Sequence, residues 1–120
     1  MAVLSFLARA LALMGLTLVL CAWTAGAQID VPSDPRASYF LLDLSRKSPA
    51  NLVTITTKRI GPSGISFARR LVNCRNMTFR YTGDADTLEE LRRQNLKGPM
   101  GPLVDGSISD VISRYACEHA

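Results

Sequence analysis

Residues 52–74 read LVTITTKRIGPSGISFARRLVNC, which is two β-rich runs joined by a turn. The first run, 52–59, is rich in β-branched residues, which favour strands. Residues 61–64 are Gly-Pro-Ser-Gly, a turn sequence in which proline presets one backbone dihedral and glycine accepts positive φ. The second run, 65–74, returns as the partner strand. This stretch therefore predicts an antiparallel β-hairpin.

Further strands are predicted on either side of the hairpin. Residues 77–82 alternate between apolar and polar side chains, so a short turn at 75–76 leads into another strand. Upstream, the short apolar run 38–42 is suitable for a buried strand. We expect a meander of three to four antiparallel strands, whose apolar face another element must cover.

Two helices are expected to supply that cover. Asp86, Thr87, Leu88 and Glu89 resemble a capping box with Asp86 as the cap, which predicts a short helix to about Gln94. A second helix is predicted to begin at Ser107. Its apolar stripe consists of Ile108, Val111, Ile112, Tyr115 and Ala116. The predicted fold class is α+β, a small antiparallel sheet covered by a short helix and a C-terminal helix.

The N-terminus has the pattern of a secretory signal peptide. Arg9 supplies positive charge, an apolar run follows over 10–23, and the small residues 25–27 complete an A-x-A ending, so we expect cleavage near Ala27. An uncleaved anchor is the alternative, but Arg9 interrupts the roughly 20 apolar residues that a membrane span needs. Lipidation of Cys21 is disfavoured because a bulky leucine precedes it.

The predicted organisation has three parts. Residues 1–27 form the signal peptide, 28–36 form a flexible tether that lacks periodicity, and 37–120 form a single domain. The predicted location is periplasmic or secreted.

Cys74 and Cys117 remain after the predicted cleavage, and in a small exported chain an even count indicates one disulfide. Closing that loop stabilises a fold by about 4 kcal/mol. At 100° per residue, however, Cys117 lies opposite Ile108 on the helix. Either the last turn unwinds or the bridge wraps around the helix end, and we expect unwinding because helix ends fray.

Composition excludes some classes of function. The chain has 14 Lys and Arg against 10 Asp and Glu, a formal charge of +4. That charge favours acidic surfaces weakly, without the basic stripe and recognisable module of a nucleic-acid-binding protein.

No catalytic or metal-binding constellation is recognisable. His119 is the single histidine, and with Glu118 it does not make a metal site. Ser63 lacks the spacing of a nucleophile elbow. An acidic cluster lacks the glycine and spacing of a calcium loop and is explained by helix capping. The cluster comprises Asp84, Asp86, Glu89 and Glu90. We therefore predict no enzyme, no metal and no cofactor.

The candidate contact residues for an anionic partner are Arg70, Arg75 and Arg80, whose guanidinium groups can hold carboxylates or phosphates. Strand alternation predicts that Arg70 and Arg80 share the outward face. That face would lie away from Phe67, Phe79 and Tyr81. The alternative is a solvated face with ordinary cross-strand pairs. Arg69 is expected at the edge of the core or at a β-bulge.

The order of these elements resembles the surface-adhesin E type of small exported bacterial protein. The resemblance is carried by the motifs Val72-Asn73-Cys74, Gly106-Ser107-Ile108-Ser109 and Tyr115-Ala116-Cys117. It spans roughly 39–117 and implies an antiparallel sheet with a disulfide-tied C-terminal helix. The chain departs from the family pattern in having Asp105 where a proline is usual and in lacking the late tryptophan.

The function expected from these observations is a non-catalytic exported envelope domain that binds a protein or an anionic envelope component. The alternative is an accessory subunit or inhibitor of a larger envelope enzyme, which would present the loop at 61–64 or at 98–102. Substitution of Arg70 and Arg80 should abolish partner binding in the first case. Deletion of a loop tip should abolish complex formation in the second.

Overall fold

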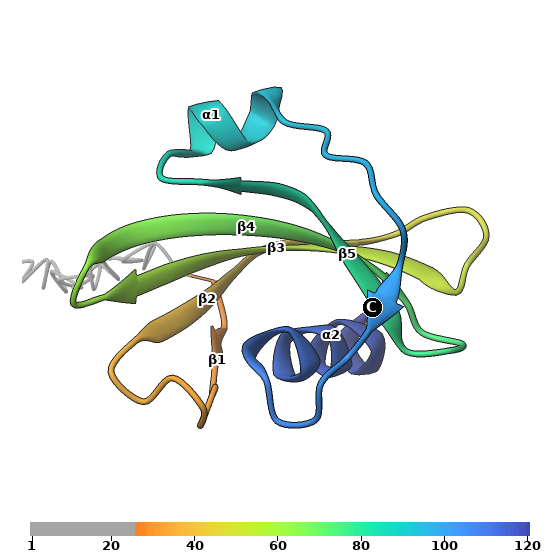
Figure 1. Cartoon of the computed structure of the whole chain (residues 1–120), viewed down its shortest axis with the longest axis horizontal. Coiled ribbons are helices and arrows are strands. Elements are labelled where there is room, and N and C mark those ends of the chain that lie inside the picture. The colour runs from red at the N-terminus through yellow and green to blue at the C-terminus, as the bar shows by residue number, and fades with distance from the viewer. Residues whose placement is uncertain (1–25) are drawn as a thin grey trace, which may run out of the picture.

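The computed structural model describes residues 26–120 and consists of one antiparallel sheet with a helix on each face (Figure 1). The six strands lie side by side in chain order. The elements are β1 (Gln28–Ile29), β2 (Ser38–Arg46), β3 (Leu52–Gly61), β4 (Gly64–Asn73), β5 (Thr78–Ala85), α1 (Leu88–Arg93), β6 (Gly101–Pro102) and α2 (Ile108–His119). The predicted α+β class and antiparallel sheet are confirmed. The predicted signal peptide lies, apart from its last two residues, outside the described part of the chain.

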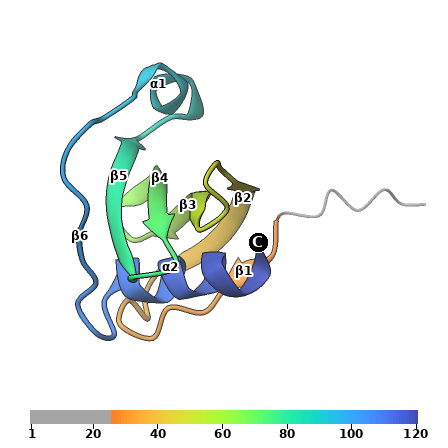
Figure 2. The same cartoon turned by 90° about the vertical axis from the view of Figure 1, so that its right-hand side faces the viewer.

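The sheet has six strands, where the sequence predicted three to four. The two extra strands, β1 and β6, have two residues each and pair with β2 and β5. A pair of residues is too short to show alternation, which explains why the sequence pattern missed them. Figure 2 shows the connection from α1 to α2 running along the β5 edge, with β6 in its path.

Residues 28–36 belong to the folded domain, so the predicted flexible tether is wrong. Ile29 and Val31 are only 4% and 5% exposed and contact the core. Backbone hydrogen bonds from Asp34 to Val31 and from Ala37 to Asp34 form the turns that the prolines of this segment favour. Ile29 in β1 and Val31 just after it thus fix this segment to the core.

The core lies between α2 and one face of the sheet. Val53 and Ile55 of β3 and Val72 of β4 are completely buried, and Ile112 and Ala116 of α2 cover them. Val53 pairs directly with Val72, so the alternation predicted for β3 places the correct residues inward. We call this side the α2 face of the sheet.

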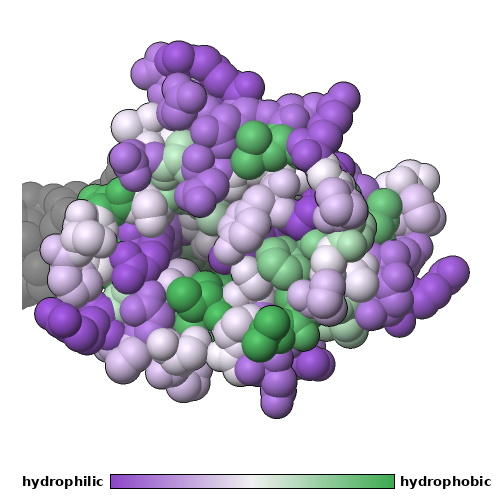
Figure 3. All heavy atoms as spheres, in the orientation of Figure 1, coloured by the Kyte–Doolittle hydropathy of each residue, from purple (hydrophilic) through white to green (hydrophobic). Residues whose placement is uncertain are grey.

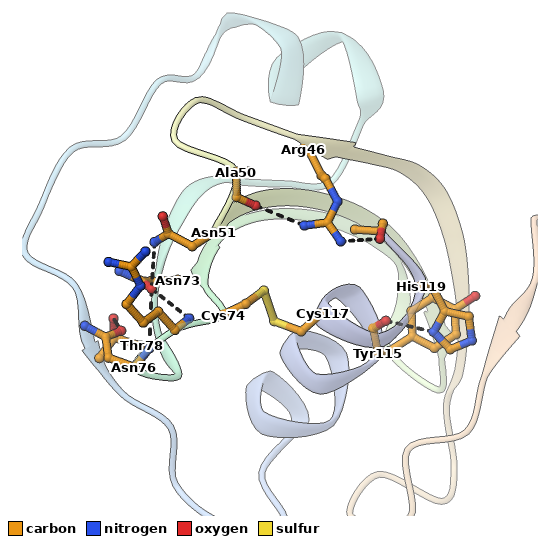
Figure 4. The surroundings of a disulfide bond; sticks show 12 residues. Arg46, Ala50, Asn51, Asn73, Cys74, Asn76, Thr78, Tyr115, Cys117 and His119 are labelled. Atoms are coloured by element: carbon orange, nitrogen blue, oxygen red, sulfur yellow. Dashed lines mark hydrogen bonds between the residues drawn. A yellow bond between two sulfur atoms is a disulfide. The ribbon is translucent and has the colours of Figure 1, made fainter.

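The disulfide joins the turn after β4 to α2 (Figure 4). Cys117 bonds Cys74 across a Cα–Cα distance of 5.6 Å, so the predicted pairing is present. The helix continues through Cys117 to His119, and the expected unwinding is wrong. The buried face of α2 includes Ser109 and Ser113 and is rotated from the apolar stripe. That rotation places Cys117 at the flank of the helix, about 70° from the centre of the buried face, where it bonds Cys74.

The opposite face of the sheet is partly covered by α1, whose Leu91 is 2% exposed. A Cβ at Gly83 would lie 2.7 Å from Leu91 Cδ1, so glycine at this position lets the Leu91 side chain pack directly on β5. The N-cap of α1 is Thr87, which accepts from Glu90 N, where the sequence predicted Asp86. The predicted Ser107 cap of α2 is confirmed by its bond from Asp110 N.

Candidate binding pocket

A pocket of about 430 Å³ opens on the α2 face, in the half of the sheet that α2 leaves uncovered. Its floor is made by side chains of β3 and β4, among them Thr57, Ser66 and Ala68. The segment between β1 and β2 contributes Asp34, and the first residue of α2, Ile108, lies at the other side. The volume is within the usual range for small-molecule sites, roughly 300–1,000 Å³.

Arg70 of β4 lies in the wall of this pocket, at the boundary with α2. Its Nε donates to Ser109 Oγ at 3.2 Å and its Nη2 to the Tyr81 hydroxyl at 3.1 Å. The hydroxyls of Tyr81 and Ser109 share a further hydrogen bond of 3.0 Å. Arg70 Cζ also lies 4.8 Å from the centroid of the Tyr81 ring, a cation–π arrangement. The guanidinium is therefore held in place by β5 and α2.

The buried charge of Arg70 is incompletely satisfied. The residue is 3% exposed, and its Nη1 is buried without a hydrogen-bond partner. Within residues 26–120 it makes no ion pair, since all four salt bridges there involve other arginines. Burying an ion without a counter-charge costs several kcal/mol. A buried arginine with spare N–H donors beside an open pocket is what a site for an acidic group requires.

A second network fixes the far wall of the pocket. Arg59 Nε donates to Asp34 Oδ2 at 2.9 Å, and the Tyr39 hydroxyl donates to the same oxygen at 2.6 Å. These two hydrogen bonds hold the pKa of the Asp34 carboxyl below its ordinary value. Burial, together with the bond to Asp34, raises the pKa of Tyr39 to about 12. The hydrogen bond to Asp34 likewise raises the pKa of Arg59. The network thus ties the segment before β2 to the sheet as a charged unit.

The formal charges around the pocket balance. Arg59 and Arg70 supply two positive charges, and Asp34 and Asp84 supply two negative charges. The Arg59–Asp34 ion pair neutralises one of each. Arg70, inside the wall, and Asp84, which is exposed on β5, remain as separated opposite charges.

The three arginines predicted as a partner contact are not brought together. Arg80 is on the opposite face of the sheet, where its Nη1 donates to Leu96 O at 2.7 Å. Arg75 is exposed in the turn between β4 and β5. The predicted common outward face of Arg70 and Arg80 is wrong, because Arg70 pairs in register with Tyr81 and so lies on the α2 face.

Arg69 is at a β-bulge, as the sequence allowed. The pairing of β4 with β5 shifts between Arg69 and Arg70, with Thr82 as the extra residue. Arg69 Nε donates to Thr82 Oγ1 at 2.9 Å, and its Nη groups donate to the carbonyls of Thr82, Leu91 and Gln94. Arg69 therefore fastens α1 to the sheet.

The other candidate residues occupy separate positions. Ser63 is exposed at the tip of the β3–β4 hairpin. His119 stacks on Tyr115 in the last turn of α2, with ring centroids 3.9 Å apart. In the part of the chain that the structure describes, no three His, Cys, Asp or Glu side chains are grouped as a metal ion needs. None of the helices within 26–120 has the length and hydropathy of a membrane crossing.

The Asp34–Tyr39–Arg59 network was not predicted from the sequence, although one signal for it was available. Arg59 has the same strand parity as Val53, Ile55 and Thr57, which places it on the face that α2 partly covers. A charged residue on a predicted core face indicates a partner elsewhere in the chain.

Figure 3 shows hydrophilic residues gathered over α1 at the top of the view, on the side away from the pocket.

Comparison with protein-family models, with curated proteins and with solved structures found no match for this chain.

Proposed function

We propose that this chain is a non-catalytic, exported binding domain of the cell envelope, which takes an acidic group of its ligand or partner into the pocket beside Arg70. The observation that carries the proposal is Arg70 Nη1, a buried donor without a partner on a residue that is 3% exposed. Native folds satisfy most buried donors, and an acceptor supplied by a bound molecule is one of the explanations for an exception.

The disulfide supports the proposed location. The Cys74–Cys117 bond is compatible with an oxidising compartment outside the cytoplasm, where such bonds persist. The apolar N-terminal run after Arg9 is the second support, because it has the signal-peptide pattern. The resemblance to surface-adhesin E-type proteins agrees with a periplasmic or secreted bacterial domain. The mature chain is proposed to begin at Gln28.

Native mass spectrometry tests this proposal. The full chain is expressed with its own N-terminal segment, recovered from the extracytoplasmic fraction and measured without denaturation. We expect loss of residues 1–27, one disulfide, and an additional bound mass from the envelope or medium. Arg70→Gln should lose that mass while the exposed control Arg75→Gln retains it. Equal loading of both variants contradicts the proposed site, and an intact N-terminus contradicts the proposed processing.

The tip of the β3–β4 hairpin favours the second candidate, an accessory subunit or inhibitor. Ile60 and Ile65 pair directly beside the turn and are 40% and 47% exposed. Two neighbouring aliphatic side chains on a projecting tip suit insertion into an apolar groove of a larger protein. Replacing both with serine should abolish capture of that partner, whereas Arg70→Gln should leave the capture unchanged. The opposite pattern assigns binding to the pocket.

A further inference from the structure

We infer that the pocket takes a small organic molecule with a single carboxylate, which Arg70 receives. This inference rests on the proposed function and gives its ligand a chemical class. It is argued from the free donors of Arg70, from the charges around the pocket and from the side chains that line it.

The donors of Arg70 are suited to a carboxylate. Nε and Nη2 are engaged by two neutral hydroxyls, those of Ser109 and Tyr81, and Nη1 is unpaired. A hydroxyl is a weaker acceptor for a guanidinium than a carboxylate oxygen, which forms a charge-assisted bond. The planar guanidinium presents Nη1 and Nη2 side by side, so one carboxylate can engage both.

Tyr81 controls access to these donors. Its side chain is on β5 and is 39% exposed, and its hydroxyl occupies Nη2 in the structure described here. Nη1 itself has no solvent-accessible surface. A rotation of the exposed Tyr81 ring opens the guanidinium to the pocket and gives Nη2 to the ligand. The Tyr81 hydroxyl is bonded to α2 through Ser109 alone, and the rotation exchanges that bond, the bond from Arg70 and the edge contact with Phe79 for contacts to the ligand.

The charges limit the ligand to one acidic group. Asp34 is already paired with Arg59, which leaves Arg70 as the free positive charge of the pocket. Asp84 lines the same pocket and would repel a second negative charge on the ligand. A phosphate dianion is therefore disfavoured relative to a monocarboxylate.

The remaining lining suits an organic body. Tyr39, Tyr81 and Ile108 offer apolar surface, and Thr57 and Ser66 offer hydroxyl groups on the floor. A pocket of about 430 Å³ accommodates an aromatic acid with room for a few further atoms. Benzoate is accordingly the simplest probe, and benzamide is its uncharged counterpart of the same shape.

Nuclear magnetic resonance titration of the disulfide-bonded domain tests the inference without a substitution. Arg70 Nε–H gives a side-chain resonance that reports directly on the guanidinium. We expect benzoate to shift this resonance together with the Tyr81 backbone amide in a saturable manner. Benzamide should shift neither at the same concentration, and inorganic phosphate should bind at least tenfold more weakly than benzoate. Equal shifts from benzoate and benzamide, or tighter binding of phosphate, would overturn the inference.

Two substitutions sharpen the assignment. Arg70→Gln should weaken benzoate binding by roughly ten- to a hundredfold, as expected for a charged hydrogen bond, while Arg75→Gln leaves it unchanged. Asp84→Asn, at an exposed position, should raise the affinity for benzoate, because a repelling charge is removed. The affinity for phosphate should rise by a larger factor, since phosphate carries more negative charge. Unaltered phosphate binding in Asp84→Asn contradicts the charge argument. A further pair of results is a ligand other than a carboxylate on the domain in native mass spectrometry, together with carboxylates that fail to bind in the titration. That pair of results overturns this inference and leaves the proposed function standing.

Discussion

Arg70 and Tyr81 are direct cross-strand partners, and the guanidinium of the arginine lies over the ring of the tyrosine with Cζ 4.8 Å from the centroid. The two side chains meet where α2 ends its cover of the sheet and the pocket begins. The arginine thereby keeps its charge in the protein interior with hydroxyls and an aromatic face in place of a counter-ion.

Replacing Arg70 with methionine should leave the free energy of unfolding unchanged or raise it by about 1 kcal/mol. The substitution removes an uncompensated buried charge, and the loss of a cation–π contact and of two hydrogen bonds to hydroxyls offsets most of that gain. Urea denaturation measures the difference. Arg69→Met is the matched comparison and should lose about 2 kcal/mol or more, because Arg69 donates to carbonyls of Thr82, Leu91 and Gln94. A similar loss in both variants would mean that Arg70 serves the fold.

Removing the disulfide should reduce the free energy of unfolding by about 4 kcal/mol, since the loop it closes spans 43 residues. The double variant Cys74→Ala/Cys117→Ala is compared with the wild type by urea denaturation, with and without a reductant. Reductant should lower the unfolding midpoint of the wild type and leave the double variant unchanged. A reductant effect below about 1 kcal/mol would contradict a stabilising bridge.

Acid should weaken the network around Asp34. Hydrogen bonds from Arg59 and Tyr39 lower the pKa of Asp34, so the folded chain favours the ionised carboxyl. This contribution is present above the ordinary value of 3.8 and is lost as the pH falls below it. Asp34→Asn should remove that part of the pH dependence from unfolding curves measured in acid. If the free energy of unfolding fell with decreasing pH equally steeply in the variant and the wild type, the assignment would be contradicted.

Base should weaken the same network through Tyr39. The pKa of Tyr39 is raised from 10.0 to about 12, so the folded chain favours the protonated phenol. The resulting stability is present below pH 10 and is lost as the pH rises towards 12. Ultraviolet titration of phenolate, with Tyr39→Phe as the reference, measures the shift. A tyrosine titrating near 10 at this position would contradict it.

Gly83→Ala should cost about 1 kcal/mol, because the added methyl group would lie 2.7 Å from Leu91 Cδ1 and the buried Leu91 side chain would have to turn aside. Gly98→Ala is the control, since a Cβ at that position meets no atom within 4 Å. Thermal unfolding of both variants against the wild type measures the difference. Equal midpoints for the two variants would contradict close packing of α1.

The central hairpin was predictable because two independent signals agree there. β-branched residues recur over 52–59, and Gly-Pro-Ser-Gly supplies the turn chemistry at 61–64, with Gly64 at φ +119° in the structure. The alternation that places Val53 and Ile55 on one face was also correct. Local patterns suffice where the residues that must agree are neighbours in sequence.

The pocket was not predictable, because its parts come from distant segments. Asp34 and Arg59 meet across two strands, and Ser109 reaches Arg70 from the other end of the chain. β4 also carries an apolar residue on each face near Arg70, Leu71 on one and Val72 on the other. The alternation of side chains along β4 therefore did not reveal which face α2 covers. The extra residue Thr82 in β5 also shifted the pairing of β5 with β4.

The position of the disulfide in the chain determines when it can form. Cys117 follows every strand of the sheet in sequence, so its bond to Cys74 can form only after all the strands have been synthesised. Between 26 and 120 these two thiols have no competitor, so a mispaired intramolecular bond cannot arise there. Among the described residues oxidation therefore has a single product, the bond that ties α2 to the end of β4, and no wrong pairing has to be reshuffled.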